Sequence, residues 1–146
     1  MSEQTITAAV VVGFSEQLEE GSAALYEEMA QRFPQHGDVF LGFAKDCQKS
    51  KVTIVRTYQE TITDAIEAGY SFAGMVMPQP LFGLALKQGQ GLKEALAVCA
   101  ALEGKANGFY TEVADRSASL LATIPGAFRR VARARAQRKS KLETMS

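Results

Sequence analysis

The chain has 146 residues, 47% of them hydrophobic, and its 16 basic and 16 acidic residues give a formal net charge of zero. This length suffices for one hydrophobic core and is too short for two, so we expect a single domain over residues 1–146. A neutral chain has no overall field that attracts nucleic acid or a membrane. The apolar runs are too short to span a bilayer and no basic leader precedes them, which predicts a cytoplasmic protein without a transmembrane helix.

Two long helices are predicted in the first half of the chain. The first covers residues 5–33, where Thr5 or Thr7 can cap its start. The second covers residues 38–68, with Asp38 as its N-cap and apolar residues at helical spacing along one face. The short stretch between them predicts an antiparallel pair.

The second half of the chain repeats this arrangement after a connection of different composition. Residues 69–91 are rich in glycine, proline and apolar side chains, which predicts a crossover packed along the helices, with a short helix at 81–87. A third helix is predicted over 92–119 and a fourth over 125–143, with Pro125 in its first turn. Two helical hairpins joined by a long crossover predict an all-α, ferritin-like four-helix bundle.

Two segments of similar sequence, 18–30 and 102–114, mark the first helix of each half. Each has a glutamate two helical turns before a tyrosine, so both side chains lie on one helix face. A carboxylate within an apolar face is costly unless it meets a cation, a metal or a proton. We therefore expect the two glutamates to define the centre of the molecule; the residues are Glu19 with Tyr26, and Glu103 with Tyr110.

These segments, the helix layout and the run Phe40-x-x-Phe43-Ala-Lys-Asp before Cys47 make the chain resemble the rubrerythrin-like branch of the ferritin-like superfamily. The resemblance implies that each half supplies a glutamate from its first helix and a Glu-x-x-His pair from its second, and that together they hold two irons. Glu19 and Glu103 match the first-helix ligands.

The second-helix ligands that the resemblance implies are absent. The pair in the second helix is replaced by Cys47 and Ser50, and the pair in the fourth helix by Arg135 and Arg138. The only histidine, His36, lies in a predicted turn. Guanidinium groups do not ligate iron, so we expect a ferritin-like bundle that has lost its di-iron site and holds no metal.

Two interpretations of these former metal positions stay open. Glu19, Glu103, Arg135 and Arg138 could form a pocket for a small anion, or an ion-pair cluster that replaces the metals; their cancelling charges favour the cluster. Arg135 is central on its helix face, whereas Arg138 is at the edge, where it could instead reach solvent. Cys47 is expected to be a buried reduced thiol, although a metal site with Cys99 and Glu103 is conceivable.

The fourth helix also carries a basic surface. This surface could contact nucleic acid, anionic lipid or an acidic protein, but no aromatic residues for base stacking are interleaved with it. A solvated face, or pairing with the acidic first helix of this or another subunit, is the favoured interpretation. The basic residues are Arg129, Arg130, Arg133 and Lys141.

The sequence thus predicts a non-catalytic binding or structural module without a cofactor, and we expect a homodimer through helix faces. The absence of phosphate loops and nucleophile–base pairs supports this interpretation. One alternative is a rubrerythrin-like oxidoreductase, of the peroxidase or ferroxidase type, with iron at a rearranged site that uses Glu19 and Glu103. A second alternative is nucleic-acid association through the basic last helix, which the neutral charge makes the weaker of the two.

Overall fold

The computed structural model describes residues 8–65, 86–117 and 123–145, and these residues are almost entirely helical, with no strand among them. The all-α prediction is therefore confirmed for the described part of the chain. A single 3-10 turn, Pro34–His36, separates the first two helices. The four long helices are α1 (Ala8–Arg32), α2 (Gly37–Ala65), α3 (Leu92–Arg116) and α4 (Thr123–Met145).

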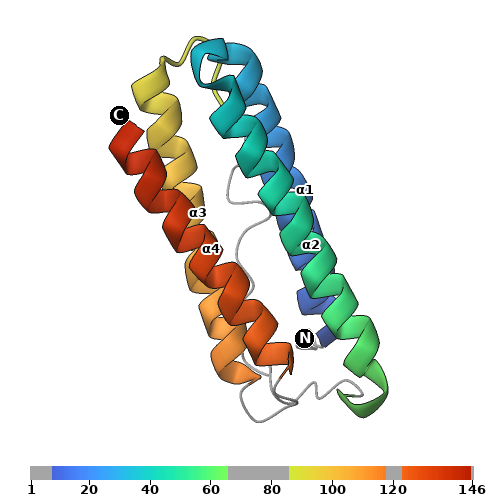
Figure 1. The fold of residues 1–146 in the computed structure, drawn as a ribbon. Helices are drawn as coiled ribbons and strands as arrows, with labels where there is room; N and C mark the ends of the chain where they lie inside the picture. Colours follow the sequence, from blue (N-terminus) through green and yellow to red (C-terminus); the bar gives the residue numbers. More distant parts are fainter. Residues whose placement is uncertain (1–7, 66–85, 118–122, 146) are drawn as a thin grey trace, which may run out of the picture.

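The helices form two antiparallel pairs that lie side by side (Figure 1). α1 packs mainly on α2, α3 packs mainly on α4, and α2 also contacts α4 across the two pairs. α2 ends and α3 begins at opposite ends of the molecule (Figure 1). This arrangement is the one that a long crossover between two hairpins requires.

The start of α2 differs from the prediction. After the turn that follows Phe33, the backbone of Gly37 already has α-helical geometry, with φ −56° and ψ −43°. The helix therefore begins at Gly37, and Asp38 lies in its first turn instead of capping it. The carboxylate at this position still faces the positive end of the helix dipole. The predicted threonine caps of the first helix lie outside the described residues.

The second helical pair also differs in its limits. α3 is described to Arg116, where the Ser117 hydroxyl donates to the carbonyl of Val113 at 2.8 Å; residues 118–122 are not described. α4 begins at Thr123, two residues earlier than predicted, so Pro125 still lies in the first turn, where its missing N–H has no helical acceptor to lose.

Most of the predicted crossover, residues 69–91, lies outside the described residues. So does most of the short helix expected at 81–87, whose last two residues are not helical. Near the start of α3, Gly89 has a φ of 84°, a conformation that glycine adopts without strain. Arg32 Nη1 donates to the carbonyl of Lys87 at 2.9 Å, which ties this segment to α1.

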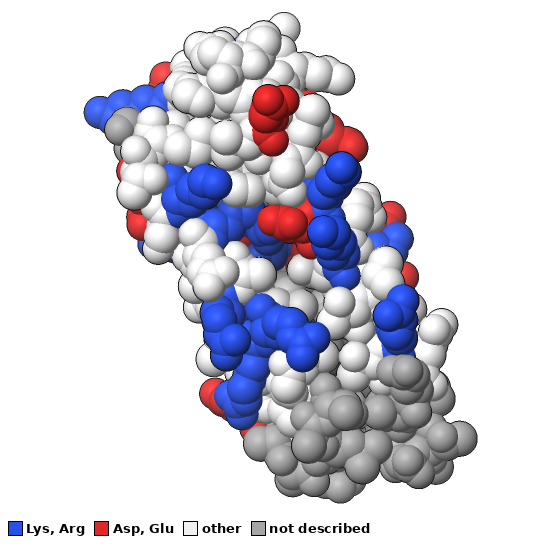
Figure 2. Space-filling view, viewed as in Figure 1, with Lys and Arg blue, Asp and Glu red and all other residues white. Residues whose placement is uncertain are grey.

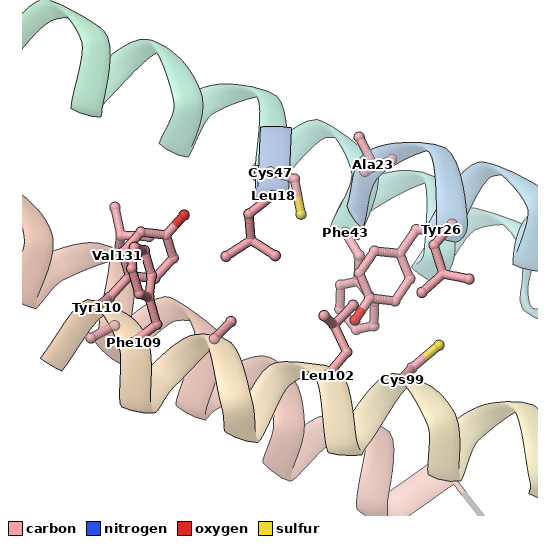
Figure 3. Close-up of a cluster of buried hydrophobic side chains, with 14 of the residues drawn as sticks. Leu18, Ala23, Tyr26, Phe43, Cys47, Cys99, Leu102, Phe109, Tyr110 and Val131 are labelled. Carbon is pink, nitrogen blue, oxygen red and sulfur yellow. The ribbon is translucent and has the colours of Figure 1, made fainter. Parts of the chain in front are cut away.

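Aromatic packing in the core follows the internal repeat. The Tyr26 ring stacks near Phe40 with centroids 6.5 Å apart, and the equivalent Tyr110 ring stacks near Phe128 at 6.0 Å. Each pair thus joins the first helix of one half to its second helix. Figure 3 shows the two tyrosines at separate positions along the bundle, with Leu18 and Cys47 between them. Apolar side chains at helical spacing therefore lie on both sides of the middle of the bundle, toward each of its ends.

None of the described helices combines the length and the apolar character that crossing a membrane demands.

Candidate functional site

The two glutamates of the repeated segments lie in the middle of this core. Glu19 on α1 and Glu103 on α3 are both 0% exposed. Buried apolar side chains of the same helices lie near them, including Leu18, Leu96 and Ala106, while the buried Ser15 and Ser22 lie one turn from Glu19. Charged carboxylates in such surroundings need cations or hydrogen-bond donors close by.

The tyrosine of each segment bonds to the glutamate of the other segment. Tyr26 Oη donates to Glu103 Oε2, and Tyr110 Oη donates to Glu19 Oε2 at 2.5 Å. The sequence predicted that these side chains share helix faces, but we did not predict this exchange. The spacing only excludes a bond within one segment, because seven residues rise about 10.5 Å along a helix and a tyrosine cannot reach that far to its own glutamate.

Arg135 bridges the two glutamates from α4. Its Nη1 donates to Glu103 Oε1 at 3.0 Å, and its Nη2 donates to Glu19 Oε2 at 2.6 Å. The same Nη2 lies 3.0 Å from the Ser22 hydroxyl, which in turn donates to the carbonyl of Leu18. The Arg135 side chain is completely buried, so α4 contributes a permanent positive charge at the centre of the molecule.

Arg138 is a second internal cation, and the expectation that it could reach solvent is wrong. Its Nε donates to Glu103 Oε2 at 2.8 Å, and the residue is only 4% exposed. Its guanidinium carbon lies 5.9 Å from the ring centroids of both Tyr26 and Phe43. Aromatic faces attract a guanidinium, so the two rings cover the Arg138 side chain and keep it away from solvent.

Burial and the neighbouring charges together set the pKa values of these buried side chains. Burial acts to lower the pKa of Arg135, but the negative charges of Glu19 and Glu103 outweigh burial and raise the pKa well above its usual value. Burial, reinforced by the neighbouring carboxylates, raises the pKa of Tyr26 and of Tyr110 well above 10.0. At neutral pH the tyrosines are therefore neutral donors and the arginine is a cation.

Three buried polar atoms of the network have no hydrogen-bond partner among the described residues: Glu19 Oε1, Arg135 Nε and Arg138 Nη2. The hydrogen bonds of the two carboxylates join α3 to α4 within one pair, and join α1 to α3 and α4 across the two pairs. The network defined by Glu19, Tyr26, Glu103, Tyr110, Arg135 and Arg138 is called the central network below.

The structure separates Cys47 and Ser50, the two α2 positions at which the resemblance implies metal ligands. Cys47 is fully buried, and burial raises its thiol pKa to about 12, against the opposing effect of Arg135 and Arg138. Ser50 is only half-buried and lines a groove between α2 and α4, outside the centre. His36 lies in the 3-10 turn with its ring 6.2 Å from that of Phe40.

The residues present do not fit a pair of irons. Both oxygens of Glu103 already accept hydrogen bonds, and Arg135 lies between the carboxylates that a metal would have to bridge. No group of three or more His, Cys, Asp or Glu side chains in the described ranges could hold a metal ion. This finding also removes the conceivable site made by Cys47, Cys99 and Glu103, since burial keeps both cysteines protonated, with pKa values of about 12.

The four residues of the predicted basic surface are all exposed on α4. Figure 2 shows basic side chains gathered over the face formed by α2 and α4. Arg129 forms an exposed ion pair with Asp115 of α3 at 3.2 Å. Lys141 Nζ lies 5.8 Å from the centroid of the Phe43 ring. Two of its residues, Arg130 and Lys141, line the same groove as Arg138.

Comparisons of the chain with protein-family models, with curated proteins and with solved structures give no match.

Proposed function

We propose that the chain is a non-catalytic binding or structural module, a ferritin-like bundle in which the central network takes the place of a di-iron centre. The observation that carries the proposal is the bridge from Arg135 to both Glu19 and Glu103. A metal ion at the same place would have to displace a guanidinium that forms two buried ion pairs. Breaking such pairs from one side leaves uncompensated charge in the core, which opposes metal entry.

The protonation of the network supports the same proposal. A catalytic acid or base works best with a pKa near the operating pH. Burial instead raises the pKa of Tyr26, Tyr110, Cys47 and Cys99, so these groups do not titrate near neutral pH. The arginine also stays charged. The network has the character of a structural device that joins helices.

Metal analysis tests this proposal against the oxidoreductase alternative. We expect protein produced with ample iron and manganese to contain no stoichiometric metal after purification, and to show no peroxidase or ferroxidase turnover after iron loading. Two metal ions per chain by elemental analysis would refute the proposal and favour the rubrerythrin-like alternative.

A motif-restoring variant gives the matched positive control. It carries Cys47→Glu, Ser50→His, Arg135→Glu and Arg138→His, which returns a Glu-x-x-His pair to each second helix. If the helices are arranged as in the ferritin-like superfamily, this variant binds metal in the same assay where the parent chain does not. A folded variant, verified by circular dichroism, that binds none would refute the ferritin-like part of the proposal.

A further inference from the structure

A groove between α2 and α4 lies outside the central network but shares one residue with it. The groove has a volume of about 390 Å³ and opens to solvent on the face seen in Figure 2. Lys49, Ser50 and Thr53 of α2 line one side, and Arg130, Gln137 and Lys141 of α4 line the other. A hollow of this size lies in the range of small-molecule sites.

The groove has an excess of positive charge that the described residues do not neutralise. Lys49, Arg130 and Lys141 are exposed, and none of them forms a salt bridge with another described residue. The one acidic residue in the lining is Asp46. Three cations against one carboxylate in a concave surface attract a small anion.

Arg138 forms part of the groove lining and carries an unused donor. Its Nε is bonded to Glu103, which holds the plane of the guanidinium, while its Nη2 is buried without a partner among the described residues. A buried N–H donor without an acceptor destabilises the fold, so an acceptor supplied from the groove would be favourable. The guanidinium is fixed in advance by Glu103, Tyr26 and Phe43, which lowers the entropy lost on binding.

We propose that the α2–α4 groove binds a phosphate group, either as inorganic phosphate or as the monoester of a small molecule. Guanidinium and ammonium groups are the preferred partners of phosphate oxygens, and the hydroxyls of Ser50 and Thr53 add neutral donors. The lining contains no metal-type ligand cluster and only one carboxylate, so a cation is a poor match. This proposal does not depend on the proposal that the centre holds no metal, because the groove uses only the outer side of Arg138. Phosphate titration tests the groove and metal analysis tests the centre, so either proposal can fail without the other.

Calorimetric titration tests the site with two probes, inorganic phosphate and glycerol 3-phosphate, at constant ionic strength. A double variant, Arg130→Gln with Lys141→Gln, removes two cations of the groove. The control, Lys45→Gln with Arg133→Gln, removes two exposed cations outside the groove, one from α2 and one from α4, and changes the net charge equally. We expect the groove variant to lose about tenfold or more in affinity and the control to lose less than about twofold.

A further variant of the groove gives a change in the opposite direction. Asp46→Asn removes the carboxylate that repels an anion and should tighten binding of both probes. Tighter binding of glycerol 3-phosphate than of inorganic phosphate would indicate a phosphorylated small molecule, and equal binding would indicate phosphate itself. Amide chemical shifts of Ser50, Thr53 and Gln137 should move during either titration.

Two results would overturn the proposal. One is that neither probe binds at millimolar concentration in low-salt buffer. The other is that the groove variant and its control weaken binding equally, which would show a diffuse cationic surface instead of a site. Retention of short duplex DNA that both double variants weaken alike, without phosphate binding, would have the same meaning and would favour nucleic-acid association.

Discussion

Arg135 has more influence on the centre of the molecule than its neighbours, because it is the only described cation that contacts Glu19. Glu103 differs, since both Arg135 and Arg138 donate to it. Loss of Arg135 therefore leaves Glu19 with Tyr110 as its only described donor and no counter-charge. Loss of Arg138 leaves the ion pairs of Arg135 intact.

We expect Arg135→Ala to lower the free energy of unfolding by about 3–5 kcal/mol, because it strands a buried carboxylate. Guanidinium unfolding at pH 7 measures this loss. Arg133→Ala is the matched control, since the residue is exposed on the same helix two positions earlier, and it should change stability by less than about 0.5 kcal/mol. Equal stability of the two variants would contradict the role of Arg135.

A compensating variant separates the ion pair from packing. Glu19→Gln combined with Arg135→Met removes one carboxylate together with its cation, while Glu103 keeps Arg138. This pair of changes should cost less than Arg135→Ala alone, because no unpaired charge remains in the core. A double variant that is less stable than the single one would show that packing, and not charge, determines the loss.

At the scale of helices, the sequence predicted where elements lie better than how they begin. Apolar spacing and proline or glycine positions gave the location of all four helices within a few residues. The start of α2 could not be predicted, because the 3-10 turn at Pro34–His36 already places Gly37 in helical geometry. Propensity rules favoured Asp38, which lies one residue further on.

The sequence predicted which residues form the central network better than it predicted which of them bond to one another. An inward glutamate on α1 and on α3, with arginines at helical spacing on α4, follows from pattern alone. The burial of Arg138 does not, because it depends on the rings of Tyr26 and Phe43, which come from two other helices. Likewise the exchange of tyrosines between segments depends on the distance between α1 and α3, which a single sequence does not contain.

The exposed face of α4 should contribute little to stability. Replacing Arg129, Arg130, Arg133 and Lys141 with glutamine together should change the free energy of unfolding by less than about 1 kcal/mol, since Arg129 alone has a described ion pair and that pair is exposed. Arg138→Gln, on the same helix but buried, is the control and should cost clearly more. A large loss in the four-residue variant would indicate that these cations pair across a subunit interface.

At the scale of the whole molecule, the central network links the two helical pairs. Arg135 and Glu19 are 116 positions apart in sequence, and Tyr26 and Glu103 are 77 apart. These bonds join α1 to α3 and α4, whereas most other described packing is within a pair. We therefore infer that the pairs unfold together and that chemistry at the centre affects the stability of the entire bundle.

Alkaline pH should reveal this coupling. Burial raises the pKa of Cys47 and Cys99 from 9.0 to about 12, and raises that of Tyr26 and Tyr110 well above 10.0. The folded state thus keeps protons that the unfolded chain releases, so the stability that these groups contribute is fully present below pH 9. It is lost as pH rises, by at most about 1.4 kcal/mol per pH unit for each group that titrates only in the unfolded state.

Variants of the cysteines and of the tyrosines identify which groups produce the slope of stability against pH. Urea unfolding between pH 8 and pH 11, with reductant present, should show Cys47→Ala with Cys99→Ala to be less sensitive to pH from about pH 9 onward. Tyr26→Phe with Tyr110→Phe should be less stable than the parent at pH 8, because two buried carboxylates lose a donor, yet should lose stability more slowly above pH 10. Parallel curves for the parent and the phenylalanine variant would mean that the phenols titrate alike in the folded and unfolded states. In that case the two hydroxyls would not be held between the buried glutamates.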